Sequence, residues 1–394
     1  MKIGLIICEY NPFHNGHLYL INKVKEELNP DAVVVIMSGN FTQRGETAVM
    51  HKYQRAKHAI LAGADMVVEL PTVFATAPAE IFAKGAVKLL NQLKGEKTLC
   101  FGIESGDKTS LLATATALAV ESKEFKGLVK DFLKEGHSLA KAKYLAIEKL
   151  NPPDVDLGFT LSPNNILALE YAKSIVEAGY QMDVLPIIRK GAGYKDLAIK
   201  GEIASAMGIR QFINENNLKK CKKLVPDFVY EDLPTILPNA DQLIMGALTI
   251  KSKKELAKII DCTEGLENRL KALLKDCFTR EELLTKATTK RYTRARLSRI
   301  TLSALLGIEE SFIFKCLKSQ LYLKVLAIKE DKLELLSKLF DKTPFIMRKS
   351  DCDKLTKTAK ECFEKDVLAN DLYNQITKNK SNEFQTIIIK KMGL

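Results

Sequence analysis

Hydrophobic residues in the first half of the chain occur in short continuous runs that alternate with helical patterns. The runs, which contain β-branched residues, occupy positions 4–8, 32–37, 64–70, 98–103 and 184–188. Between them, apolar residues recur with a helical period, as in 17–28 and 79–93. Strands that alternate with helices at this spacing predict an α/β fold with a parallel, doubly wound sheet.

The second half of the chain has a different pattern. From about Gln211 the alternation stops, and residues 211–394 read as mainly helical, with a proline-containing link near 226–240. A chain of 394 residues is long enough for two or three units. We therefore predict one domain over residues 1–210 and a mainly helical, basic domain over 211–394. A small α/β unit near 341–394 is a further prediction, since the tail contains an apolar stretch.

The first connection between a strand and a helix carries the strongest candidate chemistry. His14 and His17 lie where a turn-rich loop enters a helix. A helix N-terminus offers unpaired N–H groups and a partial positive charge, which bind phosphate, and Gly16 lets the backbone approach a ligand closely. Two imidazoles three residues apart can stabilise charge on one phosphate group. We predict that both histidines are catalytic; two exposed histidines without a role are the alternative.

Other loops should meet at the same place. Ligands of doubly wound sheets bind beyond the carboxyl ends of the strands. The loops that line the predicted crevice begin after Cys8, Met37, Leu70 and Phe101. The loop after the fifth strand begins with Arg189 and Lys190 and continues into a glycine-containing stretch, 191–194. Cations and glycines at a strand end favour phosphate binding, with a plain surface turn as the alternative.

The formal net charge of +12 is concentrated in the second half of the chain, in basic clusters. Such clusters favour polyanions such as RNA, although a lysine-rich solvated surface would look the same. In the segment Lys286–Arg299 no acid interrupts the cations, and an aromatic ring can stack on a base. The predicted RNA-binding residues are Lys290, Arg291, Tyr292, Arg294, Arg296 and Arg299.

The remaining composition excludes several classes of protein. The eight cysteines are scattered without a CxxC pair or a Cys/His metal spacing, so we predict free thiols, no protein metal site and a reducing compartment. No apolar run reaches the roughly 18–20 residues of a membrane helix, and the N-terminus lacks a secretory pattern. We predict a cytoplasmic protein with no membrane association, and no obligate protein partner is evident.

Two segments of the chain resemble known signatures. His14-x-Gly16-His17 resembles the HxGH motif of the nucleotidyltransferase superfamily, and the run Glu9–His17 is similar to the bacterial tRNA(Met) cytidine acetate ligase family. The similarity covers most of the chain and implies a Rossmann-like, HUP-type nucleotidyltransferase sheet. Ala204–Arg210 resembles a degenerate ISSTxIR signature in which Ala206 and Met207 replace two hydroxyl residues. Phosphate contacts from those two side chains are then absent, while the arginine still neutralises a triphosphate.

The resemblance also implies a set of nucleotide contacts. The implied ATP-binding residues are Ile7, Cys8, Glu9, Tyr10, Asn11, Pro12, Phe13, His14, Asn15, Gly16, His17, Leu18, Tyr19, Leu20, Gly102, Asn164, Asn165, Arg189, Lys190, Ser205 and Arg210. Which of Asn164 and Asn165 contacts the nucleotide stays open. Candidates for an acetate pocket, by position alone, are Phe41, Thr42, Gln43, Arg44 and Glu46.

By this resemblance, the reaction joins acetate to N4 of the wobble cytidine of elongator tRNA(Met). ATP would activate acetate as acetyl-adenylate with release of pyrophosphate, and the cytidine amine would then attack. Mg²⁺ is expected with ATP, although no acidic cluster identifies its ligands. One alternative is a nucleotidyltransferase that adenylylates a phosphorylated small molecule, which the basic second half argues against. A nucleotide-sensing RNA-binding protein without catalysis is the other.

Overall fold

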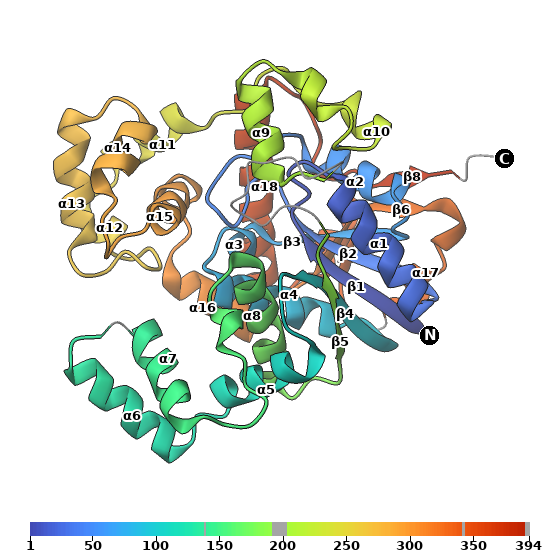
Figure 1. Cartoon of the computed structure of the whole chain (residues 1–394). Helices are drawn as coiled ribbons and strands as arrows, with labels where there is room; N and C mark the ends of the chain where they lie inside the picture. Colours follow the sequence, from blue (N-terminus) through green and yellow to red (C-terminus); the bar gives the residue numbers. More distant parts are fainter. Residues whose placement is uncertain (138, 191–202, 341–342, 391–394) are drawn as a thin grey trace.

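The computed structural model describes residues 1–394 except 138, 191–202, 341–342 and 391–394. Its centre is an eight-stranded sheet in the order β5-β4-β1-β2-β3-β6-β7, with β8 also paired to β6 (Figure 1). The strands are β1 Lys2–Cys8, β2 Ala32–Ser38, β3 Met66–Leu70, β4 Glu96–Ile103, β5 Asp183–Ile188, β6 Leu323–Lys329, β7 Phe345–Ile346 and β8 Ile387–Ile389.

The first five strands confirm the predicted α/β fold. They pair in parallel, and Gly4 of β1 lies opposite Val33 of β2 on one side and Thr98 of β4 on the other. Because both faces of these strands are covered, they are continuous apolar runs rather than alternating ones. All seven residues of β2 are buried. The carboxyl ends of these strands lie at one edge, which positions the loops discussed below.

Helices cover the sheet on both faces, as a doubly wound sheet requires. On one face, residues of α1 and α2 pack against Val33 and Val35. On the other face, residues of α4, α5 and α8 pack against Val34 and Ile36. Successive side chains of a strand point to opposite faces, which explains why neighbours join different cores. The helices of this region are α1 Asn15–Leu28, α2 Lys52–Leu61, α3 Thr72–Ala75, α4 Ala79–Asn91, α5 Lys108–Ala119 and α8 Pro163–Ala178.

Two groups of helices project from this body (Figure 1). One is the pair α6 Lys123–Lys134 and α7 Leu139–Leu150, which packs around a small core of its own at Phe125 and Ile147. The other includes α11 to α15, which lie to one side of the sheet. Helices of the second half are α9 Ala206–Asn214, α10 Asp227–Tyr230, α11 Asp241–Ile250, α12 Lys253–Leu256, α13 Leu266–Leu273, α14 Arg280–Ala287, α15 Arg294–Leu306, α16 Glu310–Lys318, α17 Leu335–Leu339 and α18 Lys357–Thr377.

For the described residues, the strands of the predicted small α/β unit near 341–394 belong to the N-terminal sheet. Strand β6 pairs antiparallel with β3, placing Ile328 opposite Met66, and β7 and β8 add to β6. The tail therefore completes the N-terminal sheet instead of forming a sheet of its own. The physical reason is that β3 would otherwise be an exposed edge with unpaired backbone groups. In the described part of the chain, no helix has the length and apolar character needed to cross a membrane.

Candidate active site

A cavity of about 210 Å³ lies beyond the carboxyl ends of β1 and β4. Its wall is formed by the loops after β1 and β2, by α1, α8 and α9, and by the start of the loop after β5. The implied ATP-binding residues that line it are Ile7, Cys8, Glu9, Tyr10, Asn11, His14, His17, Leu20, Gly102, Asn164, Arg189, Ser205 and Arg210. Residues widely spaced along the sequence thus meet in one place, at the edge where the sheet topology predicts a ligand.

His14 and His17 lie at the start of α1 with their rings stacked, centroids 3.6 Å apart. His14 is the N-cap residue, and its Nδ1 accepts a hydrogen bond from the N–H of Gly16 at 3.1 Å. Nδ1 of His17 accepts one from the N–H of His14 at 3.2 Å. Because each Nδ1 is an acceptor, the neutral form of each ring carries its proton on Nε2. Nε2–H is therefore the donor that each histidine offers to a ligand.

Both imidazoles are neutral in the free protein at neutral pH. Burial lowers the pKa of His14 to about 3, and the positive charge of Arg189 adds to the effect. Burial also lowers the pKa of His17 well below its usual value, with contributions from His14 and Arg189. A negative ligand placed against these rings would raise their pKa values again. The pair is thus suited to a group that brings its own negative charge, such as a phosphate.

Aromatic rings fix the conformation of the loop that carries the histidines. Tyr10 and Phe13 are at most 1% exposed. Their ring centroids lie 4.8 and 5.5 Å from that of His17. The buried guanidinium of Arg55 donates a hydrogen bond to the carbonyl oxygen of Glu9 in the same loop. The loop is therefore held from behind by the core, and the histidines are positioned before any ligand binds.

Gly102 and Arg189 form a second pair in the wall. A Cβ atom at Gly102 would lie 2.9 Å from Cγ of Arg189. The arginine side chain therefore occupies the space that a side chain at position 102 would need. The N–H of Arg189 bonds to the carbonyl oxygen of Ile103 at 2.9 Å. Burial lowers the pKa of Arg189, while Glu104 acts in the opposite direction. A half-buried cation of this kind gains stability when an anion binds beside it.

Asn164 and Asn165 have different environments, which bears on the open question of which one contacts the nucleotide. Asn164 lines the cavity, and its Nδ2 donates to Oε1 of Glu104 at 2.7 Å. Asn165 is 1% exposed, does not line the cavity, and binds the backbone and side chain of Ser105 and the N–H of Glu104. Asn164 is therefore the candidate for ligand contact, and Asn165 fixes the loop beside it.

The second signature forms the opposite side of the cavity. Ser205 caps α9 through its Oγ, which accepts a hydrogen bond from a backbone N–H of the first turn. Arg210 donates to the carbonyl oxygen of Asn11 at 2.9 Å and forms an ion pair with Glu46 at 3.1 Å. Through these bonds α9 connects the loop after β1 with the loop after β2. The position of the arginine beside the cavity is thus set by both loops.

The loop after β2, the positional candidate for acetate, is divided between two cavities. Gln43 and Arg44 line the first, and Glu46 lines the next one. The N–H of Gln43 donates to Oε1 of Glu9 at 2.7 Å, and burial raises the pKa of that carboxyl group. The other two candidates are buried side chains, Phe41 and Thr42.

Some of the implied nucleotide contacts do not line the cavity. Phe13 is part of the core below it, and Nδ2 of Asn15 donates to the carbonyl oxygen of Lys223. Lys190 lies over the ring of Tyr19, its Nζ 4.9 Å from the ring centroid, beside a smaller neighbouring cavity. The implied contacts outside the main cavity are Pro12, Phe13, Asn15, Gly16, Leu18, Tyr19, Asn165 and Lys190. The predicted loop 191–194 lies outside the described residues.

An apolar wall was missed by the sequence analysis. Phe82 and Phe101 line the cavity together with three residues of α8. Those three are Leu167, Ala168 and Tyr171, which follow Asn164 at helical spacings of three, four and seven. That spacing places them on the same face as Asn164, so the helical period was a signal that could have identified them. An apolar surface opposite polar groups is typical of a site for a planar ring such as adenine.

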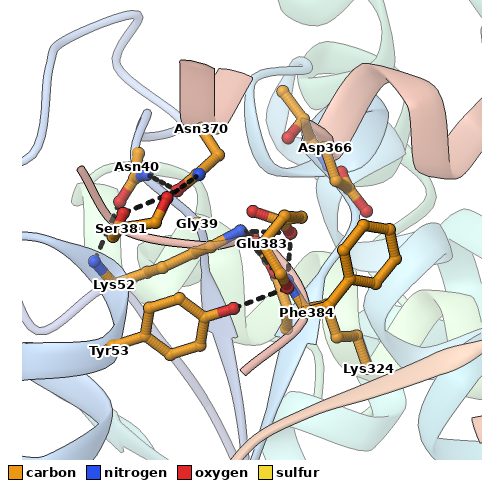
Figure 2. Close-up of polar contacts among 12 residues, drawn as sticks. Gly39, Asn40, Lys52, Tyr53, Lys324, Asp366, Asn370, Ser381, Glu383 and Phe384 are labelled. Carbon is orange, nitrogen blue, oxygen red and sulfur yellow. Dashed lines mark hydrogen bonds and ion pairs between the residues drawn. The ribbon is translucent and has the colours of Figure 1, made fainter. Parts of the chain in front are cut away.

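Behind the site, a cluster of buried charges fixes the loop after β2. Figure 2 shows Lys52 and Lys324 both reaching Glu383. Lys52 also binds Glu69 at 2.8 Å, and these side chains are at most 3% exposed. Burial tends to lower the pKa of Lys52, but the charges of Glu383 and Glu69 raise it well above its usual value. Burial tends to raise the pKa of Glu69, but the two lysines bring it below its usual value. Each charge therefore has a partner of opposite sign, and the C-terminal segment is joined to the first residue of α2, directly after the loop.

The described residues offer no complete site for a metal ion. Among them there is no group of three or more His, Cys, Asp or Glu side chains placed to hold one. Glu9 is the carboxylate in the main cavity, and its Oε1 already accepts a hydrogen bond. Any Mg²⁺ here would therefore depend on phosphate oxygens and water for most of its ligands.

The basic segment that was predicted to bind RNA has acidic partners after all. Arg291 forms two hydrogen-bonded contacts of 2.8 Å with Glu264, and Arg294 pairs with Glu281. The partner of Arg299 is Asp261, at 3.5 Å, and Arg296 binds the carbonyl oxygen of the same residue. The argument from missing acids is thus wrong, because the acids come from other helices and loops. Exposed cations remain: Lys290, Arg291 and Arg294.

Comparisons with known proteins agree with this geometry. Residues 1–386 match the family model of the HIGH Nucleotidyl Transferase. A tRNA(Met) cytidine acetate ligase of Thermoanaerobacter sp. (strain X514) is 39% identical over 392 residues, covering 97% of each chain. The apo crystal structure of Thermotoga maritima TmcAL superposes with a TM-score of 0.92 at 29% identity, covering 99% of this chain and 100% of that one. A second structure of that protein, bound with alpha-thio ATP, gives 0.90 at 28% identity, with the same coverage.

Proposed function

The chain belongs to the tRNA(Met) cytidine acetate ligase family of HIGH nucleotidyl transferases, and from that premise we propose that it joins acetate to a cytidine of tRNA(Met) at the expense of ATP. The observation that carries the proposal is the stacked pair His14 and His17, whose Nε2–H donors lie in a cavity with Arg189 and an apolar wall. This arrangement has the parts that adenylyl transfer needs: donors for phosphates, a cation, and a surface for a base.

In the first half-reaction, a carboxylate oxygen of acetate attacks the α-phosphate of ATP. The new bond gives acetyl-adenylate, and the bond to the β-phosphate breaks, so that pyrophosphate leaves with both electrons of that bond. His14 and His17 donate hydrogen bonds to the phosphates, while Arg189 and Arg210 neutralise the charge that develops on the leaving group. Because His14 and His17 are neutral before the ligand binds, the free protein does not bury two adjacent positive charges without a partner.

The adenine ring is expected to lie against the apolar wall of α8, with Asn164 at its edge. Acetate needs a cation near the α-phosphate, and Arg44 of the loop after β2 is the guanidinium that lines the cavity there. Gln43 beside it supplies a side-chain amide. These two assignments replace the wider set of loop residues suggested by position, because the remaining members are buried or line the neighbouring cavity.

In the second half-reaction, N4 of the wobble cytidine attacks the acyl carbon of acetyl-adenylate. The carbon–nitrogen bond forms, the bond between the acyl carbon and the phosphate oxygen breaks, AMP leaves, and the amine gives up one proton.

We expect elongator tRNA(Met) to contact the exposed cations Lys290, Arg291 and Arg294 through its phosphates. Residues 1–210 with the C-terminal strands would then provide activation, and the helices after α10 would provide RNA contact. Mg²⁺ is expected to arrive with ATP, and the cytoplasm is the expected location.

The test is incubation of the full chain with ATP, acetate and unmodified tRNA(Met), followed by mass spectrometry of the nucleosides. The expected result is N4-acetylcytidine that depends on both ATP and acetate, and pyrophosphate release that depends on acetate. Release of pyrophosphate with a phosphorylated small molecule in place of acetate would support the adenylylating alternative instead. Binding of ATP and RNA without any turnover would leave only the RNA-binding alternative.

A further inference from the structure

Three cavities of the molecule meet at one residue, Met207. It lines the main cavity of about 210 Å³ that contains His14 and His17, named the nucleotide cavity from here on. It also lines two further cavities of about 420 and 460 Å³, which lie between the loop after β2, α9 and the helices α11, α14 and α15. The proposed adenylation chemistry uses only the first cavity. The other two have volumes within the range of small-molecule sites. The two outer cavities share Glu46, Asp241 and Arg280 and border the nucleotide cavity at Met207, and we call them together the crevice.

The crevice is lined by both carboxylate and guanidinium groups. Glu46 and Asp241 line both outer cavities together with Arg280. Arg210 pairs with Glu46 at 3.1 Å, and Nη1 of Arg280 lies 4.0 Å from Asp241. Glu46 is 42% exposed and Asp241 33%, so both carboxylates are accessible from the crevice. The wall thus offers acceptors and donors side by side, together with the apolar thioether of Met207.

This crevice has a rigid frame. Arg280 is 7% exposed, and its Nη2 donates to the carbonyl oxygens of Gly45 at 2.7 Å and Ser298 at 2.8 Å. Gly45 has a φ of +72°, and a Cβ there would lie 2.5 Å from the backbone of Ser298. The loop after β2 is therefore in close contact with α15. Two distant parts of the chain are fixed together around the space between them, which is a property of a built site.

We propose that this crevice receives the acceptor base of the RNA, a cytosine from a single-stranded segment, and delivers its amine to the nucleotide cavity at Met207. The proposal rests on the proposed function and adds the second substrate's subsite. Cytosine carries an amine donor next to two acceptors, and carboxylates recognise the amine while arginine recognises acceptors. Bases are read by proteins in this way when they are unstacked from single strands. The methionine thioether makes favourable contact with an aromatic ring.

The position of Met207 gives the crevice its direction. Because it lines all three cavities, a base stacked on it would have its edge at the boundary with the nucleotide site. At the outer end, Arg294 lines the third cavity and belongs to the exposed basic segment. Phosphates of the strand would be held there while the base enters. Met207 occupies the position at which the superfamily signature has a hydroxyl residue. The substitution removes a possible phosphate contact and provides an apolar surface on which a ring can stack.

A cross-linking experiment tests the location directly. The probe is an anticodon stem-loop RNA that carries 4-thiouridine in place of the acceptor cytidine, irradiated with the full chain in the presence of ATP. We expect cross-linked peptides that contain the loop 43–47 or Met207. Cross-links confined to other surfaces, such as the helix pair α6 and α7, would overturn the subsite. Acetate-dependent release of pyrophosphate, measured without RNA, reports separately on the proposed function.

A variant tests the chemistry. Asp241→Asn keeps the shape of the side chain and lies outside the nucleotide cavity. We expect kcat/KM for tRNA to fall about tenfold, as when one carboxylate contact to a base is lost, with unchanged acetate-dependent pyrophosphate release. The matched control is Asp227→Asn, an exposed carboxylate on α10 outside the three cavities. An equal loss in both variants, or no loss in Asp241→Asn, would contradict the proposal. If the unaltered protein released no pyrophosphate in response to acetate, the proposed function itself would be rejected.

Discussion

Two charged regions lie on either side of the loop after β2, and they are built in opposite ways. In the buried cluster, Lys52 and Lys324 are paired with Glu69 and Glu383, and every member is at most 3% exposed; Figure 2 labels Lys52, Lys324 and Glu383. In the nucleotide cavity, by contrast, burial lowers the pKa of the cation Arg189 and of both histidines. Each charge of the cluster already has a partner of opposite sign, although burial still lowers the pKa of Lys324 and raises that of Glu383. The cavity, in contrast, gains its opposite charge only when an anion arrives.

The difference separates a structural use of charge from a functional one. A buried set with equal numbers of both signs holds distant segments together but has no capacity for a ligand. A cavity whose cations are destabilised by burial is stabilised by binding, which is how an anion site obtains affinity. Both regions contact the same connection, the loop 39–51 with Lys52 directly after it. The loop can therefore be positioned by the cluster and still present Gln43 and Arg44 to the cavity.

Breaking the cluster should produce the largest effect of all, and it should be an effect on stability. In Lys52→Met, both Glu69 and Glu383 lose a partner at 2.7–2.9 Å and stay buried. Removal of one member of such a pair costs about 3–5 kcal/mol in the free energy of unfolding. Urea denaturation followed by circular dichroism measures it. Lys360→Met, an exposed lysine of α18, is the control, and a loss below about 1 kcal/mol in the cluster variant would show that the charges are not coupled.

Breaking the histidine pair should leave stability nearly unchanged and reduce catalysis. Asparagine is a good N-cap residue, so His14→Asn keeps the start of α1 while it removes the imidazole. We expect acetate-dependent pyrophosphate release to fall about 10²–10³-fold, as for other preorganised donors, with a similar loss in His17→Asn. A histidine variant that unfolds as readily as Lys52→Met would show that the histidines, like the buried cluster, have a structural role. Near-normal turnover would remove them from the mechanism.

The exposed cations of the basic segment should affect RNA alone. Replacing Lys290, Arg291 and Arg294 by Ala removes charges outside the nucleotide cavity, whereas Arg296 and Arg299 are left because they brace the loop at Asp261. The affinity for tRNA should fall, and the salt dependence should decrease by roughly one unit per lost phosphate contact at most. Filter-binding titrations at several salt concentrations measure this.

The control for that variant is the triple replacement of Lys354, Lys357 and Lys360 by Ala, exposed lysines that give the same change in net charge. Acetyl-adenylate formation should be unchanged in both proteins. If both lose tRNA affinity equally, overall charge and not the basic segment is responsible. If ATP affinity falls with the first variant, the segment has been assigned to the wrong ligand.

The smallest expected effect is a dependence of stability on pH. Burial holds the pKa of His14 and of His51 at about 3, whereas both titrate near 6.5 when unfolded. The unfolded chain therefore binds more protons below pH 6.5, and the free energy of unfolding falls as the pH decreases from there toward 3. Between pH 7 and 5.5 we expect roughly 1 kcal/mol from His14. His14→Asn should show a shallower slope over this window in urea melts, and an unchanged slope would mean that folding does not lower the pKa of the ring.

Local signals in the sequence were enough for the first half of the fold and for the residues at the centre of the candidate site. A continuous apolar run of four to eight residues predicts a buried strand, and the period of three to four residues in 17–28 predicts α1, because both patterns report on neighbours within one element. The histidine pair was found for the same reason: its members are three residues apart on one helix start. The apolar wall of α8 was encoded equally locally, at helical spacing from Asn164.

What the sequence by itself determined, then, is the parallel sheet from β1 to β5 and the nature of its first loop. Only the tertiary structure decided which residues far apart in the chain meet. It placed β6 against β3, gave Arg291 and Arg294 their acidic partners Glu264 and Glu281, and made Met207 common to three cavities. The physical reason is that pairing across hundreds of residues depends on which strand edge and which charge remain unpaired once the core has formed. No periodicity along the chain records that information.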